Sequence, residues 1–169
     1  SASLTYMLML LHLGYYDEIL LHCKKVRNLQ TQLKQIKSSK LLQNAIFNTA
    51  PSYELAVYVT IADVKKAIAL IPEIEEGIEQ FKSLMNEQHY SVWCFNVSLT
   101  YFLNEDYKSA LKWLNYIINE TVDRIRTDFT LSVTIFRLII HYELQNESFY
   151  PYLLRSSYRR ISKLHFNPR

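Results

Sequence analysis

Apolar residues recur at steps of three and four along most of the chain, which is the spacing of one face of an α-helix. The pattern is clearest between residues 18 and 37, where one face carries Ile19, Leu20, Cys23, Val26, Leu29, Leu33 and Ile36. Similar spacing predicts helices over residues 4–13, 52–61, 88–103, 107–120, 128–144 and 149–164. Short polar turns separate these segments. The pattern therefore predicts an all-α fold without a convincing strand.

Capping residues and prolines set the boundaries of the remaining helices. Ser38 and Ser39 suit the N-cap of a helix that stops before Pro51, because proline cannot continue the backbone hydrogen-bond ladder. Another helix begins at Val64 and runs toward Pro72. Pro72 either kinks that helix or starts a second one, and the sequence leaves both readings open.

The composition favours long helices joined by short loops. The 169 residues include only two glycines, although sheet proteins need many glycine-rich turns. The two cysteines, Cys23 and Cys94, lie far apart in apolar helical patterns, so we expect buried free thiols. No apolar run approaches the roughly 18 residues of a membrane span. We expect one cytoplasmic domain over residues 1–169, cut from a longer chain because it does not begin with Met.

Four segments that cross predicted turns are similar to one another. They begin at Leu10, Tyr58, Tyr101 and Tyr142, at intervals of 48, 43 and 41 residues. Each has a large apolar or aromatic residue on the outgoing helix, followed by a short polar turn. Self-similarity at a period of 20 to 50 residues is the signature of a repeat architecture.

The third segment resembles the tetratricopeptide repeat family. Ser98 stands at the small position where the two helices of a hairpin cross, and Tyr101 stands at the aromatic wedge. Tyr107 opens the second helix, Ala110 is its small contact residue, and Val122 replaces the closing proline of the family. The intervals exceed the roughly 34 residues usual in the family, so the resemblance is to divergent repeats.

The resemblance implies an α-solenoid of antiparallel helix hairpins, wound as a right-handed superhelix with a concave groove. Residues 71–77 and 139–144 are also similar to a Bacteroidetes-type group of repeat proteins of unassigned function. Under the family register, the residues five positions before each wedge face the groove as a polar ladder. These predicted partner-binding residues are Thr5, Tyr53, Asn96 and Arg137.

The apolar neighbours of this ladder allow two interpretations. They form an apolar floor of the groove that binds a partner, or they are covered by another helix of the same chain. These residues are Phe95, Leu99, Phe102 and Phe136.

Candidate catalytic groups are sparse. The histidines lack metal-ligand spacing, and two glycines cannot build the loops that cradle phosphates. The acidic residues Glu73, Glu75, Glu76 and Glu79 lie in one charge-rich run, which is typical of a solvated helix face. We therefore expect no enzyme, no catalytic residue, no metal and no cofactor.

The sequence thus favours a non-catalytic scaffold that binds a protein or peptide in its groove. The alternative is a regulatory or sensor domain of a transcription or signalling protein whose output domain lies outside this chain. Nucleic-acid binding through Arg155, Arg159, Arg160 and Lys163 is the third hypothesis, and the net charge of +3 gives it little support. We expect neither a small-molecule substrate nor a membrane partner, and self-association stays open.

Overall fold

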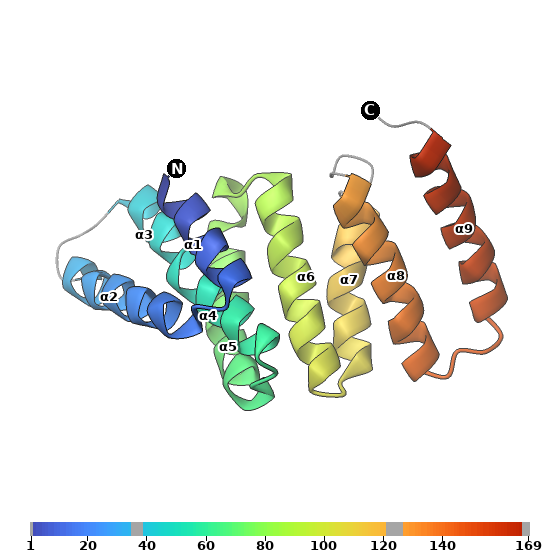
Figure 1. The fold of residues 1–169 in the computed structure, drawn as a ribbon, viewed down its shortest axis with the longest axis horizontal. Coiled ribbons are helices and arrows are strands. Elements are labelled where there is room, and N and C mark those ends of the chain that lie inside the picture. The colour runs from blue at the N-terminus through green and yellow to red at the C-terminus, as the bar shows by residue number, and fades with distance from the viewer. Residues whose placement is uncertain (1, 35–38, 121–126, 167–169) are drawn as a thin grey trace. The chain divides into compact units, whose positions relative to one another are not determined.

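The computed structural model describes residues 2–34, 39–120 and 127–166, and every regular element in these ranges is helical (Figure 1). The all-α prediction is confirmed. In chain order the elements are α1 (Ala2–Leu13), α2 (Tyr16–Lys34), α3 (Lys40–Phe47), α4 (Ala50–Thr60), α5 (Val64–Phe81), the short 3-10 helix η1 (Lys82–Leu84), α6 (Glu87–Leu103), α7 (Tyr107–Glu120), α8 (Thr127–Glu143) and α9 (Tyr150–Phe166).

The capping residues and prolines act as local rules predict, and the structure refines the positions of Pro51 and Pro72 within their helices. The Ser39 side chain accepts a hydrogen bond from the Leu42 amide and caps α3. Pro51 lies in the first turn of α4, where a missing N–H removes no helical hydrogen bond, so α4 begins two residues before the predicted start. Pro72 lies inside α5, which continues through it as one helix.

The chain divides into two compact units, Ser1–Met85 and Asn86–Arg169. The single repeat domain over residues 1–169 stays a prediction. In the first unit α4 packs against both α2 and α5, while α1 packs on α2 (Figure 1). The core between α1, α2 and α4 consists of Met7, Leu10, Ile19, Cys23, Ala50, Tyr53 and Val57.

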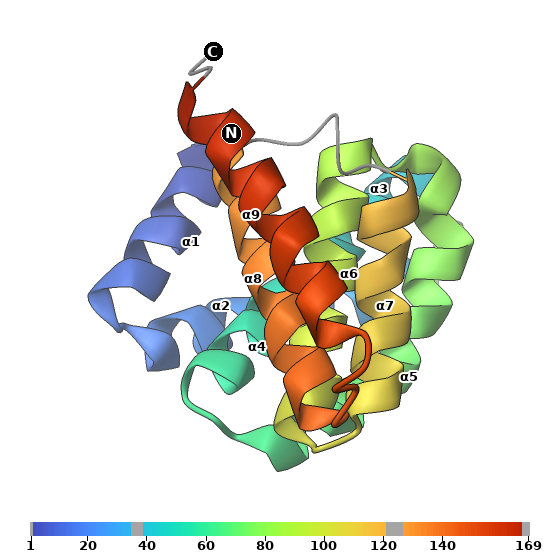
Figure 2. The same ribbon diagram turned by 90° about the vertical axis from the view of Figure 1, so that its right-hand side faces the viewer.

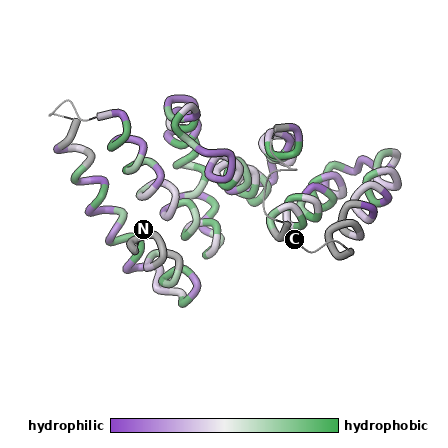
Figure 3. Tube along the Cα trace, turned by 90° about the horizontal axis from the view of Figure 1, so that it is seen from above, coloured by the Kyte–Doolittle hydropathy of each residue, from purple (hydrophilic) through white to green (hydrophobic). Residues whose placement is uncertain are grey.

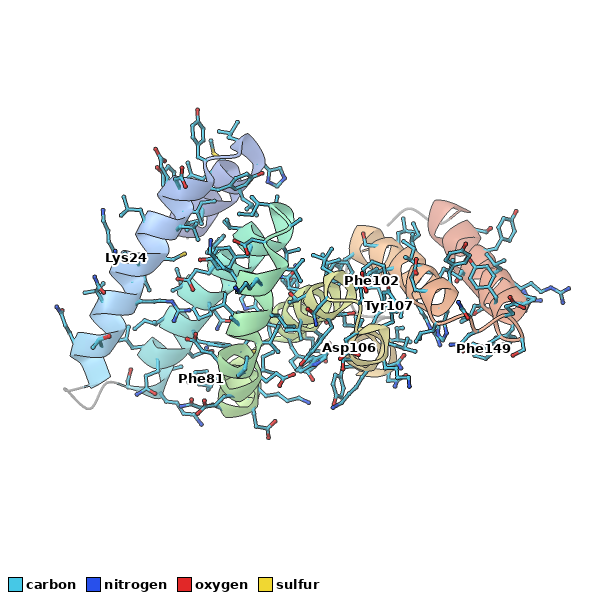
Figure 4. The ribbon with its side chains drawn as sticks, turned by 90° about the horizontal axis from the view of Figure 1, so that it is seen from below. Lys24, Phe81, Phe102, Asp106, Tyr107 and Phe149 are labelled. Atoms are coloured by element: carbon cyan, nitrogen blue, oxygen red, sulfur yellow. The ribbon has the colours of Figure 1, made fainter. Side chains whose placement is uncertain are left out.

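The second unit is built around the hairpin of α6 and α7. Ser98 is fully buried, and its hydroxyl donates a hydrogen bond to the Ala110 carbonyl oxygen across the hairpin at 2.7 Å. The predicted close crossing at these two residues is therefore confirmed. Phe102 and Tyr107 lie side by side where α6 turns into α7, with ring centroids 5.3 Å apart (Figure 4).

Two further helices extend the second unit. α8 packs on α7, and α9 packs on α8, over which it lies in Figure 2. Polar and apolar residues alternate along these helices (Figure 3), as expected for helices with one buried face. Buried apolar side chains of this unit include Val97, Ala110, Leu114, Ile117, Val133, Ile140 and Leu153.

Four helix-helix turns share one backbone conformation. One residue in each turn has a positive φ: 79° at Gly14, 55° at Ala62, 60° at Glu105 and 55° at Gln145. At each turn, two amides that follow the helix bond back to carbonyl oxygens three and five residues earlier. This is the Schellman pattern, which satisfies carbonyl groups left over at a helix end.

The hydrogen bonds of these turns lie close to the predicted segment starts. The carbonyl groups that accept the longer-range bond belong to Leu10, Tyr58, Tyr101 and His141. The first three agree with the predicted segment starts, but the fourth lies one residue before Tyr142. The last two of these carbonyl groups are therefore 40 residues apart, one fewer than the predicted interval of 41.

Candidate functional site

The predicted partner-binding residues of the first unit differ in how they can be placed. The side chain of Thr5 lies outside those that the structure describes. Tyr53 is buried in the core beside Cys23 and Val57, where burial raises the pKa of its hydroxyl. Tyr53 is thus a core residue of this unit, with little surface to offer a partner.

The predicted partner-binding residues of the second unit are both half-buried. Asn96 lies on α6, where its main-chain carbonyl oxygen accepts a hydrogen bond from the Thr100 hydroxyl at 2.8 Å. Arg137 lies on α8 and lines a cavity of about 30 Å³ together with Leu153 and Ser157 of α9. Arg137 therefore lies at the packed side of α8, facing α9. A polar ladder that joins these residues to those of the first unit stays a prediction.

The apolar neighbours of the ladder pack against each other in the second unit. The ring centroids of Phe95 and Phe136 lie 5.5 Å apart, and those of Phe102 and Phe136 lie 5.3 Å apart. Phe129 extends the cluster, 5.3 Å from Phe95. The sequence left two interpretations open for these residues, and these ring contacts between α6 and α8 agree with packing inside the chain. Such tilted ring pairs stabilise a core beyond the area that they bury.

Arg27 holds three helices of the first unit together. From α2, its guanidinium donates hydrogen bonds to Glu54 of α4 at 2.8 and 2.9 Å and to Glu73 of α5 at 2.8 and 3.0 Å. The hydrogen bonds with Glu54 raise the pKa of Arg27 above its ordinary value, while burial opposes this rise. The sequence analysis placed Glu73 on a solvated acidic face, so its pairing with Arg27 was missed. It is a structural contact, because each charge already has its partner within the unit.

The predicted state of the cysteines is confirmed. Cys23 and Cys94 are buried free thiols. Burial raises the pKa of Cys23 to about 12, and the negative charge of Glu54 adds to the rise. A thiol with so high a pKa is protonated at neutral pH and is a poor nucleophile.

Exposed apolar side chains form one stripe on α8. Ile135, Ile139 and Tyr142 follow each other at steps of four and three, so they share one face of the helix. All three are exposed, Tyr142 by 67% of its surface. The spacing was visible in the sequence, but sequence alone does not say that no other helix of the unit covers it.

A second stripe runs along α9. Pro151, Leu154 and Tyr158 are spaced by three and four residues and are exposed, Tyr158 by 74%. Arg155 and Arg159 are exposed beside them. The opposite face, with Leu153 and Ser157, is buried. α9 thus presents aromatic, aliphatic and cationic groups on its outer side.

The two stripes meet at a hollow of about 700 Å³ where α8 turns into α9. Tyr142 of the first stripe and Pro151 of the second both line it, with His141, Glu143, Gln145, Asn146, Glu147 and Tyr150. This volume is in the range of about 300–1,000 Å³ found for ligand pockets. Phe149, at the start of α9 (Figure 4), packs 5.5 Å from the buried His141 ring. The hollow and the stripes together form the α8–α9 surface.

The described residues bring together no group of three or more His, Cys, Asp or Glu side chains suited to a metal ion. In the same ranges, every helix is too short or too polar to serve as a transmembrane span.

The chain has no match among family models, curated proteins or solved structures. Kinship with the tetratricopeptide repeat family therefore stays a prediction.

Proposed function

We propose that this chain is a non-catalytic interaction module that docks a partner polypeptide on the α8–α9 surface. The observation that carries the proposal is the convergence of two exposed apolar stripes on one hollow. Exposed apolar groups that gather in one place mark interaction sites more often than scattered ones do. Tyrosine also contributes more than most residues to binding hot spots, because its ring buries a large area and its hydroxyl still bonds.

The stripes suit a partner segment with its own apolar face, such as an amphipathic helix. Such a segment would bury residues at steps of three and four against α8 and α9. The exposed Arg155 and Arg159 beside the α9 stripe favour acidic residues on that flank of the partner. The hollow at the end of the stripes would receive one anchoring side chain, as hot-spot residues of interfaces commonly fill pockets.

We also propose that the helix hairpins are divergent tetratricopeptide-like repeats of an α-solenoid. The shared Schellman hydrogen bonds of four turns support this, as does the buried Ser98–Ala110 contact of the α6–α7 hairpin. The groove residues Asn96 and Arg137 stay the binding prediction of that arrangement.

The test is affinity capture from an extract of the native cell, with variants compared on the same partner. We expect Leu154→Ser and Ile139→Ser to weaken capture of that partner by at least about fivefold, since hot-spot truncations cost more than about 1 kcal/mol. Leu41→Ser is the matched control, because Leu41 is an exposed leucine on α3. Equal capture by all three variants would overturn the proposal. Asn96→Ala combined with Arg137→Ala tests the groove separately.

A further inference from the structure

The hollow at the end of the α8–α9 surface has aromatic walls. Tyr142 and Tyr150 both line it, and their ring centroids lie 6.3 Å apart with the ring planes at 57°. At this angle the rings form two adjoining walls of a corner instead of a closed stack. Tyr142 is largely exposed, so the face of its ring is available to a ligand.

The charge of the hollow has one sign. Glu143 and Glu147 are exposed and are the charged residues among the described ones that line it. His141 is buried, and its Nδ1 lies 3.0 Å from the side-chain amide nitrogen of Asn146. Burial and then the nearby charge of Arg137 lower the pKa of His141, which favours the neutral ring. The charged groups among the described residues that line the hollow are therefore two carboxylates, and Arg137 acts on His141 from outside this lining.

We propose that the hollow binds the cationic side chain of an arginine or lysine in the partner polypeptide. The inference rests on the proposed function and names the residue that anchors the partner. The face of an aromatic ring is negative, so it attracts an ammonium or guanidinium group placed over it. Glu143 and Glu147 add Coulombic attraction from the rim of the same hollow. Aromatic faces and carboxylates together select cations over neutral side chains of equal size.

The binding is weak for an isolated residue. A cation over an exposed ring gains about 0.5–1 kcal/mol, which corresponds to a two- to fivefold change in affinity. The interaction with exposed carboxylates is also modest and is screened by salt. The hollow thus adds selectivity to a docking surface whose affinity comes from the apolar stripes.

The experiment uses defined probes on the intact protein. N-acetyl-arginine amide and N-acetyl-lysine amide are titrated while the chemical shifts of the Tyr142 and Tyr150 rings are followed by NMR. N-acetyl-norleucine amide is the neutral probe, and tetramethylammonium is the free cation. We expect saturable shifts with the arginine and lysine amides at millimolar concentration, and none with the norleucine amide.

Variants assign the effect to the hollow. Tyr142→Leu is expected to weaken binding of the arginine amide by about threefold. Tyr142 is exposed, so the fold tolerates this change. Glu143→Gln combined with Glu147→Gln tests the carboxylates without touching the aromatic walls. Tyr158→Leu is the matched control, since this exposed tyrosine lies on α9 and is not among the residues that line the hollow.

Three outcomes contradict the assignment. Equal binding of the norleucine amide would make the hollow a simple apolar site. Tighter binding of tetramethylammonium than of both amides would assign it to a free quaternary cation. Unchanged arginine binding in both the Tyr142 and the double glutamate variants would place the cation elsewhere. In each case, loss of partner capture by Leu154→Ser still supports docking on the stripes, so the two proposals fail separately.

Discussion

Substitution of Gly77 by alanine tests the packing of α3 on α5. Gly77 is a buried residue of α5, and the Phe47 ring of α3 lies against its backbone. A Cβ atom at this position would stand 2.5 Å from both Cδ2 and Cζ of Phe47, and closer still to Cε2. The ring has little room to move, because it is 5% exposed and packs 5.5 Å from the Phe81 ring.

Two effects of opposite sign decide the result. Alanine is favoured over glycine inside a helix by about 1 kcal/mol. Forcing an extra carbon into a packed contact costs about 1–3 kcal/mol, since the ring or the helix must shift. We expect the clash to prevail, so Gly77→Ala lowers the free energy of unfolding by up to about 2 kcal/mol.

The assay is urea-induced unfolding followed by circular dichroism, for Gly77→Ala alone and in a Phe47→Ala background. Phe47→Ala removes the ring and costs about 3–5 kcal/mol by itself. In that background Gly77→Ala no longer meets a ring, so it should become stabilising by about 1 kcal/mol. The reasoning is refuted if Gly77→Ala stabilises the wild-type protein, or if its effect is the same in both backgrounds.

Other contacts predict further outcomes. Arg27→Ala should destabilise the protein by about 3 kcal/mol in urea unfolding, because it leaves the buried carboxylate of Glu54 without its counter-charge. Glu73→Gln should cost less than about 1 kcal/mol, and equal losses for the two variants would contradict this ranking. Cys23, whose pKa burial raises to about 12, should resist iodoacetamide at pH 8 until urea unfolds the chain, and rapid labelling of the folded protein would contradict its burial. Because burial lowers the pKa of His141 below its ordinary value of 6.5, its contribution to stability is present above that value and is lost as the pH falls below it; His141→Asn should flatten the decline in melting temperature between pH 7.5 and 5. Glu105→Gly should stabilise by about 0.5–1 kcal/mol, since it relieves a positive φ at a turn, and a Glu105→Ala variant, which keeps the Cβ, should not.

Local rules were sufficient wherever a feature depends on neighbours within one turn of helix. The helix boundaries followed from apolar spacing and from caps such as Ser39. The Ser98–Ala110 contact was expected from the resemblance to the repeat family, whose small positions these two residues match. Three of the four turns place a positive φ at a residue other than glycine, so their backbone conformation could not be predicted from the positions of the glycines.

The candidate site was less predictable from the chain. The α8 stripe could be predicted from its spacing, yet Phe136 and Ile139 of the same helix differ in burial. Phe136 is buried among the other rings, while Ile139 is exposed. Apolar periodicity marks which residues share a face, but not which face finds a partner helix.

The sequence by itself determined that the chain is helical, where its turns lie and that its two thiols are buried. These features depend on backbone hydrogen bonding and on apolar spacing, which act over a few residues. Only the tertiary structure decided that Arg27 joins Glu54 and Glu73, that Phe47 packs on Gly77, and that two stripes converge beside Tyr142. Such contacts join residues far apart in the chain, and their energies depend on which helix faces meet, which no local pattern encodes.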